Sequence, residues 1–371
     1  MTELAATPDH DSAYDLLGTM FQCSACGDRH TVNLQDVVVR DGLDDVVREQ
    51  LAKHASGARI AVVADARTET VAGDRVAATA ARAGYNVFLC AVPDHPQHGT
   101  PVCDDVTMRW LEGELGDCDF LVGAGSGVIS DLVKWVALER DVRYMIVATA
   151  PSMNGYASDN IAPTIRGVKA LVYGKGPVAV VSSPDILAAS PARMIASGLG
   201  DVVAKWVSSS DWRMNNVLFD ETLCPLCLDI VHEAESRFAD CAPGLAARDR
   251  RAVKGLFDAL ILTGVSMSIA GTSAPASGGE HLISHTLDMM STIDGEPHDL
   301  HGRQVGVGTV FAAAVYEMLL REENPEWVVP PSTFDVTFWA GLSDAVQTEH
   351  EKKRKRRVDP AARLGADRSL W

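Results

Sequence analysis

The chain has 371 residues, of which 47% are hydrophobic and 22% charged, and its formal net charge is −17. This profile is typical of a soluble globular protein with two or more domains. An acidic surface repels the phosphates of nucleic acids and of anionic membranes, so we expect neither as a partner. No apolar run reaches the roughly 18 residues that span a membrane, and the first residues are too acidic for a signal peptide. We therefore expect a cytoplasmic protein.

The first part of the chain alternates strand patterns with helical patterns. The apolar runs Arg59–Asp65 and Asn86–Cys90 predict two buried strands, and the alanine-rich stretch Val71–Ala83 between them predicts a helix. Two more apolar runs, CDFLVGAG and VRYMIVATAP, flank the helical pattern VISDLVKWVALER. This alternation predicts a parallel sheet with helices on both faces and ligands at the carboxyl ends of its strands.

The pattern changes after Pro151. The stretch KALVYGKGPVAVVS predicts a hairpin with a Gly-Lys-Gly turn, and the chain from Pro184 onward is mostly helical in pattern. We predict an α/β N-terminal dinucleotide-binding domain over residues 1–183, followed by an all-helical C-terminal domain over residues 184–371. The charged run EHEKKRKRR favours a solvated helix end over a nucleic-acid or localisation patch.

A glycine-rich loop follows the predicted strand CDFLVGAG. Backbone amides in such a loop can approach a pyrophosphate at a helix N-terminus, although glycines also serve tight strand-to-helix turns. Asp65 ends an earlier strand, where a carboxylate can accept hydrogen bonds from a ribose diol, but Arg67 nearby weakens that inference. The later segment TAPSMNGYAS suits close packing against a flat cofactor ring or forms a surface turn.

Histidines are concentrated in one run, GGEHLISHTLDMMSTIDGEPHDLHGRQVGVG, in which Glu280 precedes the first of them. By spacing alone, His281 and His285 could be two metal ligands on one helix face, with His301 as the third. Asp201, on a predicted helix, would by itself be interpreted as a surface or helix carboxylate.

Two cysteine pairs have the CxxC spacing, Cys23 with Cys26 and Cys224 with Cys227. Two such pairs can complete a tetrahedral zinc site, but these lie about two hundred residues apart instead of the usual 15–20. The alternatives are a shared structural zinc or two local turns with reduced thiols.

Five ordered motifs carry a family resemblance: GAGSGVISDLVKW, TAPSMNGYAS, SGLGDVVAKW, GGEHLISH and HGRQVGVG. Together they resemble sn-glycerol-1-phosphate dehydrogenases, within the iron-containing alcohol dehydrogenase and dehydroquinate synthase-like superfamily. The early CSACGDRH is similar to the bacterial AraM-like branch. The resemblance covers roughly Cys23 to Met318, and five motifs in order are more specific than one glycine loop.

The resemblance implies a metal-dependent, NAD(P)-linked oxidoreductase. Its reaction would interconvert dihydroxyacetone phosphate and sn-glycerol 1-phosphate by hydride transfer at a metal-bound alcohol or ketone. Asp201, His281 and His301 match the ligands of one divalent ion, zinc or nickel, and one carboxylate with two imidazoles leaves positions open for substrate. The matches to the dinucleotide contacts are Asp65, Gly123, Ala124, Gly125, Ser126, Gly127, Thr149, Ala150, Pro151, Ser152 and Ser158.

His285 matches a catalytic, substrate-contacting position, where it would relay a proton or bond a substrate hydroxyl. Substrate contacts are also implied for Asp201 and Asn154. The expected partners are a small, phosphorylated polyol or ketose and further copies of the chain, in a homo-oligomer of two or more subunits. His298 matches no family position and is interpreted as a bystander.

One position departs from the family pattern, which commonly has an aspartate where Asn154 stands. An amide removes a charge and adds a hydrogen-bond donor. Two alternatives therefore stay open, a dehydrogenase of another polyol or ketose derivative in a specialised pathway, and a sugar-phosphate cyclase. Lys205 and Arg303 are candidates to neutralise a phosphate, or are surface charges.

Overall fold

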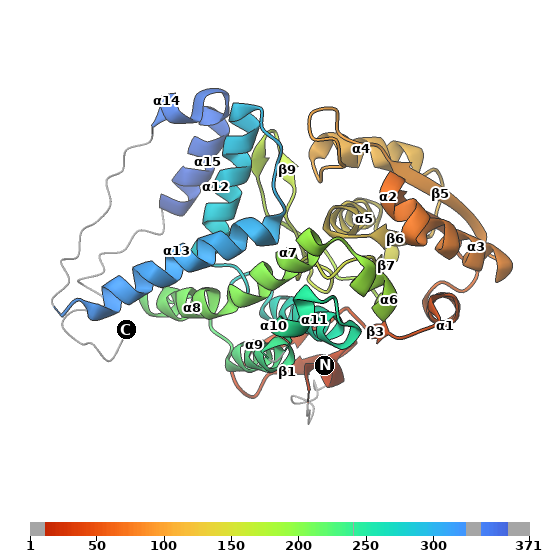
Figure 1. Ribbon diagram of the computed structural model, residues 1–371, viewed down its shortest axis with the longest axis horizontal. Coiled ribbons are helices and arrows are strands. Elements are labelled where there is room, and N and C mark those ends of the chain that lie inside the picture. Colours follow the sequence, from red (N-terminus) through yellow and green to blue (C-terminus); the bar gives the residue numbers. More distant parts are fainter. Residues whose placement is uncertain (1–11, 240, 324–334, 355–371) are drawn as a thin grey trace.

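The computed structural model describes residues 12–239, 241–323 and 335–354 (Figure 1). Its largest sheet has six strands in the order β3-β12-β7-β6-β4-β5, and every neighbouring pair is parallel. This confirms the predicted parallel sheet. The strands are β3 (Asp36–Val39), β4 (Arg59–Asp65), β5 (Asn86–Val92), β6 (Phe120–Gly125), β7 (Arg143–Ala148) and β12 (Ala179–Ser182).

Helices cover both faces of this sheet. Helices α1 (Leu43–His54) and α3 (Asp74–Arg82) pack on one face, and α4 (Asp105–Glu114) and α5 (Gly127–Arg140) pack on the other. Successive side chains of a strand point to opposite faces, so Val62 of β4 belongs to the first layer and Val63 to the second. Burial on both faces explains why these strands are continuous apolar runs. The short turns α2 (Ala66–Thr68) and η2 (Glu69–Gly73) lead from β4 into α3.

The predicted hairpin over KALVYGKGPVAVVS is wrong. Strand β11 (Val172–Tyr173) pairs with β8 (Asn160–Ile161), and β10 (Val168–Lys169) pairs with β9 (Thr164–Ile165). Strand β12 instead lies between β3 and β7 in the main sheet, with all four of its residues buried. A short apolar run after a glycine turn fits both a hairpin strand and an inner strand of a parallel sheet. Because all four residues of β12 are buried, the inner position is favoured.

The chain from Pro184 is helical throughout its described part, as predicted. The charged run near the C-terminus begins in the last of these helices and continues outside the described residues. The helices are α6 (Pro184–Ala189), α7 (Ala192–Val203), α8 (Lys205–Phe219), α9 (Pro225–Phe238), α10 (Ala242–Ala246), α11 (Arg250–Ala270), α12 (Gly279–Asp294), α13 (His301–Arg321), α14 (Val336–Trp339), η3 (Ala340–Leu342) and α15 (Ser343–Arg354).

Helix α11 corrects the expectation that no segment reaches membrane-spanning length. By length and composition this helix could cross a membrane, but 83% of its apolar window is buried inside the protein. Its side chains belong to the main hydrophobic cluster together with those of the sheet. Such burial is that of a core helix.

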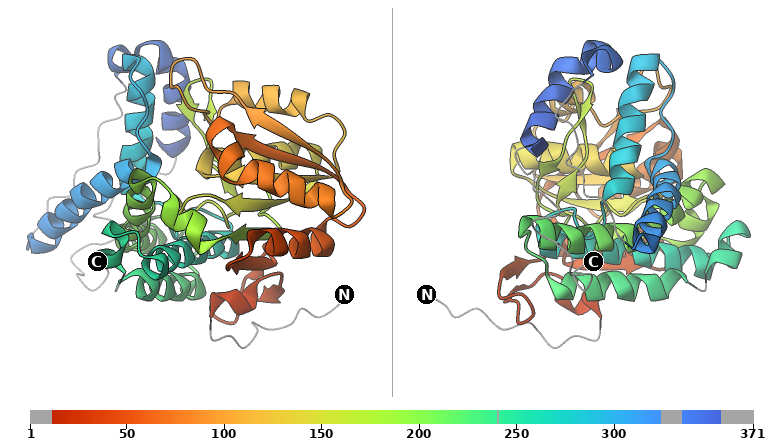
Figure 2. Two further views of the ribbon diagram at one scale, coloured as in Figure 1. Left: turned by 45° about the vertical axis from the view of Figure 1, so that its right-hand side comes forward. Right: turned by 90° about the vertical axis from the view of Figure 1, so that its left-hand side faces the viewer.

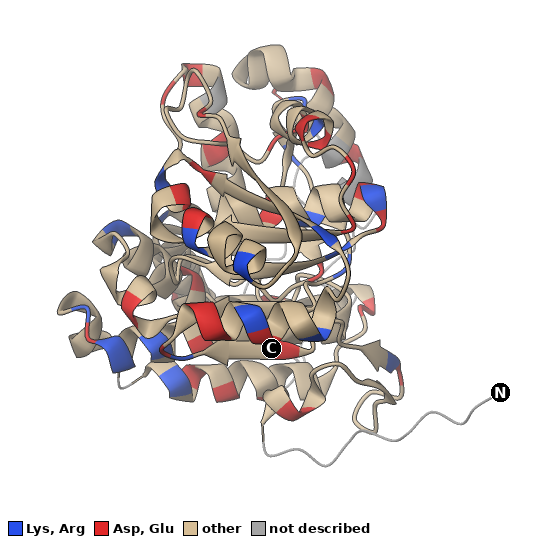
Figure 3. Ribbon diagram, turned by 90° about the vertical axis from the view of Figure 1, so that its right-hand side faces the viewer, with Lys and Arg blue, Asp and Glu red and all other residues tan. Residues whose placement is uncertain are grey.

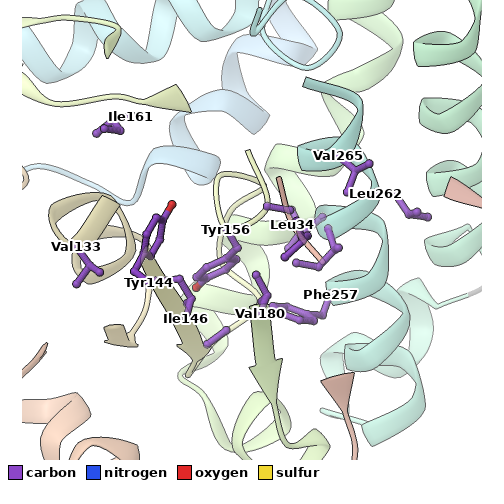
Figure 4. Close-up of a cluster of buried hydrophobic side chains, with 14 of the residues drawn as sticks. Leu34, Val133, Tyr144, Ile146, Tyr156, Ile161, Val180, Phe257, Leu262 and Val265 are labelled. Atoms are coloured by element: carbon purple, nitrogen blue, oxygen red, sulfur yellow. The ribbon is translucent and has the colours of Figure 1, made fainter. Parts of the chain in front are cut away.

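One continuous core joins the sheet to the helical region (Figure 4). The rings of Tyr156 and Phe257 lie 5.8 Å apart between centroids, with Val180 of β12 and Ile146 of β7 in the same cluster. The cleft described below is therefore formed by two regions that pack on each other through a shared interior.

The N-terminal segment lies against the helical region (Figure 2). It contains η1 (Ala13–Leu16) and the antiparallel pair β1 (Met20–Gln22) and β2 (Arg29–Thr31). The Ser12 hydroxyl and the Ala13 amide both donate to the Glu233 carboxylate of α9, at 2.5 and 3.0 Å.

Acidic and basic residues are interspersed along the ribbon in Figure 3. Several of them form ion pairs, including Arg59 with Asp119 at 3.0 Å and Arg40 with Glu49 at 2.6 Å. Exposed pairs of this kind contribute little stability, about 0–1 kcal/mol each.

Candidate active site

A cleft of about 940 Å³ lies between the carboxyl ends of the strands and the helical region. Its wall on the sheet side includes Ser126 and Gly127, after β6, and Ser152, after β7. Its other wall includes His281 and His285 from α12 and His301 from α13. The carboxyl edge of a parallel sheet is where the sequence placed the ligand site.

Glycines bring α7 unusually close to its neighbours. A Cβ added at Gly198 would lie 1.9 Å from the carbonyl oxygen of Pro151, and one at Gly200 would lie 2.1 Å from that of Gly302. Side chains at these positions would therefore separate α7 from both the loop after β7 and the first turn of α13. This contact explains the motif SGLGD, because it brings Asp201, which is 0% exposed, within 3.7 Å of His281, a residue that lines the cleft.

The Asp201 carboxylate is held by three donors. The backbone amide of Asn154 donates to Oδ2 at 2.8 Å, and the Asn154 side-chain amide donates to Oδ1 at 3.1 Å. The Lys205 ammonium donates to Oδ1 at 3.0 Å and also to the Ala276 carbonyl at 2.8 Å. Burial raises the pKa of Asp201, but Lys205 and the facing histidines outweigh it and hold that pKa below its usual value. Asp201 is therefore a carboxylate at neutral pH.

These contacts correct the phosphate candidates. Lys205 is 1% exposed and its ammonium is committed to Asp201 and a carbonyl, so it does not reach the cleft. Arg303 pairs with Asp299 at 3.4 Å and is absent from the cleft lining. Lys169 of β10, which the sequence interpretation missed, lines the cleft and pairs with Asp288 at 3.2 Å. Lys169 pairs with Thr164 in the short hairpin of β9 and β10, whose turn is formed by Arg166 and Gly167.

His281 is oriented by its neighbour in sequence. Its Nδ1 lies 2.7 Å from Oε1 of Glu280, a carboxylate that is 0% exposed and also accepts the Gly278 amide. A carboxylate accepts hydrogen bonds, so Nδ1 carries a proton, and Nε2 is the nitrogen that faces the other ligand candidates. That Nε2 points to Asp201, at 3.7 Å from Oδ1. The motifs assigned Glu280 no role; its position next to His281, a metal-ligand candidate, was the one sign of this contact in the sequence.

Nδ1 of His301 also donates a hydrogen bond, but its acceptor is a hydroxyl instead of a carboxylate. Its Nδ1 lies 3.2 Å from the Ser284 hydroxyl, which donates its own proton to Oε1 of Gln304 at 2.9 Å. The hydroxyl oxygen must therefore accept from Nδ1, which leaves Nε2 of His301 as the free lone pair. Burial, followed by the influence of His281, lowers the pKa of His301 to about 4. The ring is neutral at physiological pH.

The donor set fits a divalent metal. A carboxylate and two imidazoles, each with its Nδ1 bonded to a neighbouring residue, are the side-chain types that hold a catalytic metal with open positions. The rings of His281 and His301 lie 5.1 Å apart between centroids. The structure thus brings together Asp201, His281 and His301, the three residues predicted as ligands.

His285 lies beside these residues. Its ring centroid is 5.9 Å from that of His301 and 6.4 Å from that of His281, and it lines the cleft. Burial, then the neighbouring histidines, lowers the pKa of His285 well below its usual value, so the ring is neutral. His298 also lines the cleft, where Nδ1 lies 3.4 Å from Oδ1 of Asp288.

We expect Glu280→Gln to weaken metal affinity by about 10–100-fold, because the amide cannot supply the negative charge that raises the basicity of His281. Calorimetric titration of the metal-free protein measures this change. Glu317→Gln, at an exposed ion pair on α13, is the matched control. Equal affinities in the two variants would show that Glu280 does not support a ligand.

The predicted dinucleotide contacts separate into two groups. Ser126, Gly127, Ser152 and Ser158 line the cleft. The other six do not line it: Gly123, Ala124 and Gly125 are the last residues of β6, and Thr149, Ala150 and Pro151 directly follow β7. A Cβ at Gly123 would lie 2.8 Å from Ile146, and one at Gly125 would lie 2.6 Å from Ile129, so both glycines serve close packing.

Asp65 lies apart from the described cleft lining. Its Oδ1 caps α2 by accepting the backbone amides of Arg67 and Thr68 at 2.7 and 3.0 Å. The Arg67 guanidinium pairs with Asp94 at 2.8 Å. Asp65 nonetheless ends β4 at the same edge of the sheet as the glycine-rich loop.

Comparisons with known proteins agree with this geometry. Residues 38–191 match the family model "iron-containing alcohol dehydrogenase". A glycerol-1-phosphate dehydrogenase (NAD(P)+) of Bacillus licheniformis is 30% identical over 303 residues, which cover 81% of this chain and 75% of that protein. A protein of the same name from Methanothrix thermoacetophila is 31% identical over 253 residues, covering 68% and 69%.

Solved structures share the fold. A probable glycerol dehydrogenase from Sinorhizobium meliloti has a TM-score of 0.60 at 20% identity, with 75% of each chain covered. Sulfoacetaldehyde reductase from Bifidobacterium kashiwanohense, solved with NAD+, has a TM-score of 0.58 at 15% identity, with 88% and 85% covered. Because the chain is 30% identical to its Bacillus relative over three quarters of that protein, it belongs to the glycerol-1-phosphate dehydrogenase family of iron-containing alcohol dehydrogenases.

Proposed function

We propose that the protein is a metal-dependent, NAD(P)-linked dehydrogenase that interconverts dihydroxyacetone phosphate and sn-glycerol 1-phosphate. The observation that carries this proposal is the convergence of Asp201, His281 and His301: both histidines line the cleft at the carboxyl edge of the sheet, and buried Asp201 lies 3.7 Å from His281. The names of its relatives supply the substrate and the cofactor. Metal-loaded protein should oxidise NADH or NADPH with dihydroxyacetone phosphate and lose this activity in EDTA.

Asp201, His281 and His301 would hold one divalent ion, for which we propose zinc or nickel, since two imidazoles and a carboxylate suit either. When bound, the ion supplies a Lewis acid at the reacting oxygen, and the dinucleotide supplies or accepts the hydride. The Lys205 ammonium keeps Asp201 ionised. Glu280 and Ser284 accept hydrogen bonds from Nδ1 of His281 and His301, which leaves Nε2 of each ring for the metal.

The remaining residues bind and orient the reactants. The N-terminus of α5, at Ser126 and Gly127, would hold the pyrophosphate of the dinucleotide, since the Ser126 side chain makes no capping bond there. The other proposed dinucleotide contacts are Asp65, Gly123, Ala124, Gly125, Thr149, Ala150, Pro151, Ser152 and Ser158. His285, neutral and beside the ligands, would exchange a proton with the substrate hydroxyl through a ring nitrogen.

Lys169 is the residue we propose for the substrate phosphate. Among the described residues that line the cleft it is the one lysine, and none is an arginine. Its side chain is 20% exposed and its ammonium lies 3.2 Å from Asp288, on the helix that carries His285. A cation here would bind and partly neutralise a phosphate on the substrate.

We propose Asn154 as a contact of both substrate and metal ligand, because it lines the cleft and donates to Asp201. Asn154→Asp would replace a donor by a second carboxylate beside Asp201. We expect tighter metal binding by about tenfold and a metal-free protein destabilised by about 1–3 kcal/mol. Unfolding in urea with EDTA and with zinc measures both effects.

Asn154→Ala removes the donor without adding charge and serves as the control. If Asn154→Asp binds the metal no more tightly than Asn154→Ala, the side chain at this position does not influence metal affinity through its contact with Asp201. If Asn154 alone alters substrate selectivity, Asn154→Asp also raises kcat/KM for dihydroxyacetone phosphate, and an unchanged value excludes that idea.

We propose a division into a dinucleotide-binding domain, residues 1–183, and a helical metal- and substrate-binding domain, residues 184–371, in a cytoplasmic homo-oligomer. Support for association comes from α13, whose side chains Val310, Phe311 and Met318 are 73%, 62% and 73% exposed. This helix projects from the body of the molecule (Figure 1).

Phe311→Glu is expected to shift the protein from an oligomer to a monomer in sedimentation, because it places a charge on this apolar face. Glu317→Gln, on the same helix, should leave the oligomer intact. An oligomer unaffected by Phe311→Glu would move the interface elsewhere.

A further inference from the structure

The two CxxC pairs meet in space, and a histidine joins them. Cys23, Cys26 and Cys224 lie together with His30, and their ligand atoms are all within 4.8 Å of one another. Cys23 and Cys26 both lie in the turn between β1 and β2, His30 is in β2, and Cys224 directly precedes α9. The first and last of these residues are 201 positions apart in sequence.

The spacing within this cluster is that of a tetrahedron around a metal. Zinc bonds of about 2.3 Å to sulfur and about 2.0–2.1 Å to nitrogen place two sulfurs about 3.8 Å apart and a sulfur and a nitrogen about 3.5 Å apart. Cys23 Sγ lies 3.8 Å from Cys224 Sγ. Nε2 of His30 lies 3.5 Å from Cys224 Sγ and 3.2 Å from Cys26 Sγ.

The turn between the first two cysteines is shaped to present both sulfurs. Gly27 has a φ of 81°, and its amide donates to the Cys23 carbonyl at 2.9 Å, which closes the turn. The Asp28 amide donates to Cys26 Sγ at 3.4 Å, and the Cys23 amide bonds back to the Asp28 carbonyl at 2.8 Å. Backbone donors to sulfur stabilise a ligating thiolate.

The same geometry distinguishes the cluster from two alternatives. A disulfide needs sulfurs about 2.0 Å apart, and the pair Cys23 and Cys224 is at 3.8 Å. Two independent turns would leave each pair among its own neighbours, whereas Cys224 contacts both Cys23 and His30 across the chain. Cys227, the second member of its pair, lies within α9 and is not one of the four clustered ligands.

We propose that Cys23, Cys26, His30 and Cys224 bind a structural zinc ion, separate from the active-site metal. Four protein ligands close the coordination sphere, so this site is structural and not catalytic. It fastens the N-terminal hairpin to α9. The hairpin needs such a link because its two strands have three residues each, too few for independent stability.

Cobalt substitution of the full-length protein tests this site without dependence on activity. The proposed active-site ligands include no sulfur, so an intense sulfur-to-cobalt charge-transfer band reports on the cysteine cluster alone. We expect this band, with tetrahedral d–d transitions, and two metal equivalents per chain when both sites are filled. His281→Ala should remove one equivalent and keep the band. Cys26→Ser should remove the band, while Cys227→Ser keeps it.

If Cys26→Ser fails to fold, His30→Cys provides a second test, because four thiolates still bind the metal and shift the d–d bands. No sulfur-to-cobalt band in the wild-type protein would overturn the proposal. So would a Cys23–Cys224 disulfide, seen as a loss of two hydrogen atoms in the intact mass, or alkylation of the partly exposed Cys26 that is equally fast with and without metal.

Discussion

Asp201→Ala is expected to abolish retention of the active-site metal, while the ion proposed at the cysteine cluster stays bound, and to lower kcat/KM by more than about 1,000-fold. Removal of a direct ligand costs more than the 10–100-fold typical of residues that support ligands. The variant also leaves the Lys205 ammonium buried without its carboxylate, which costs about 3–5 kcal/mol of folding stability. Metal content by mass spectrometry and steady-state kinetics measure the two effects.

The double variant Asp201→Ala with Lys205→Met separates loss of the ligand from loss of stability. It removes both charges of the buried pair, so it should fold while still lacking the active-site metal. Lys205→Met alone keeps the carboxylate and should retain the metal. A double variant that is folded and keeps its full metal stoichiometry would refute Asp201 as a ligand.

Lys169→Met is expected to lower kcat/KM for dihydroxyacetone phosphate by about 10–100-fold. This range corresponds to the loss of one hydrogen bond to a charged group, about 1.5–3 kcal/mol. Dihydroxyacetone has no phosphate, so its kcat/KM should stay within about twofold. Lys169→Arg should restore part of the lost activity, because it keeps the positive charge.

Lys175→Met, at an exposed ion pair with Asp141, is the control for a general change in surface charge. An equal fall for both ketones in Lys169→Met would mean that Lys169 acts by positioning Asp288 and not by binding phosphate. Wild-type activity equal for both ketones would favour a dehydrogenase of unphosphorylated polyols.

Local patterns predicted the elements of the sheet, because strands buried on both faces are continuous apolar runs. The segment Arg59–Asp65 was predicted at its observed limits, and Asn86–Cys90 extends by two residues in the structure. The hairpin assigned to β11 and β12 was wrong because both strands pair with residues distant in sequence. Local hydrophobicity does not specify such partners.

Residue types and order pointed to the three metal ligand candidates, but their supporting contacts depend on packing. Lys205 stands four positions after Asp201, a spacing that allows an ion pair, but only the packing of the helices shows that both groups are buried. The partner of His301, Ser284, comes from another helix. The contact of His30 with Cys224, 194 positions away, likewise follows from the tertiary fold.

The most direct test of the proposed function is dinucleotide oxidation by metal-loaded protein, with NADH and NADPH, zinc and nickel, and dihydroxyacetone phosphate against dihydroxyacetone. We expect turnover that depends on the phosphate, disappears in EDTA and returns on addition of one of the two metals. Absence of turnover with either ketone, in protein that demonstrably binds metal and dinucleotide, would contradict the assignment of dihydroxyacetone phosphate as the substrate.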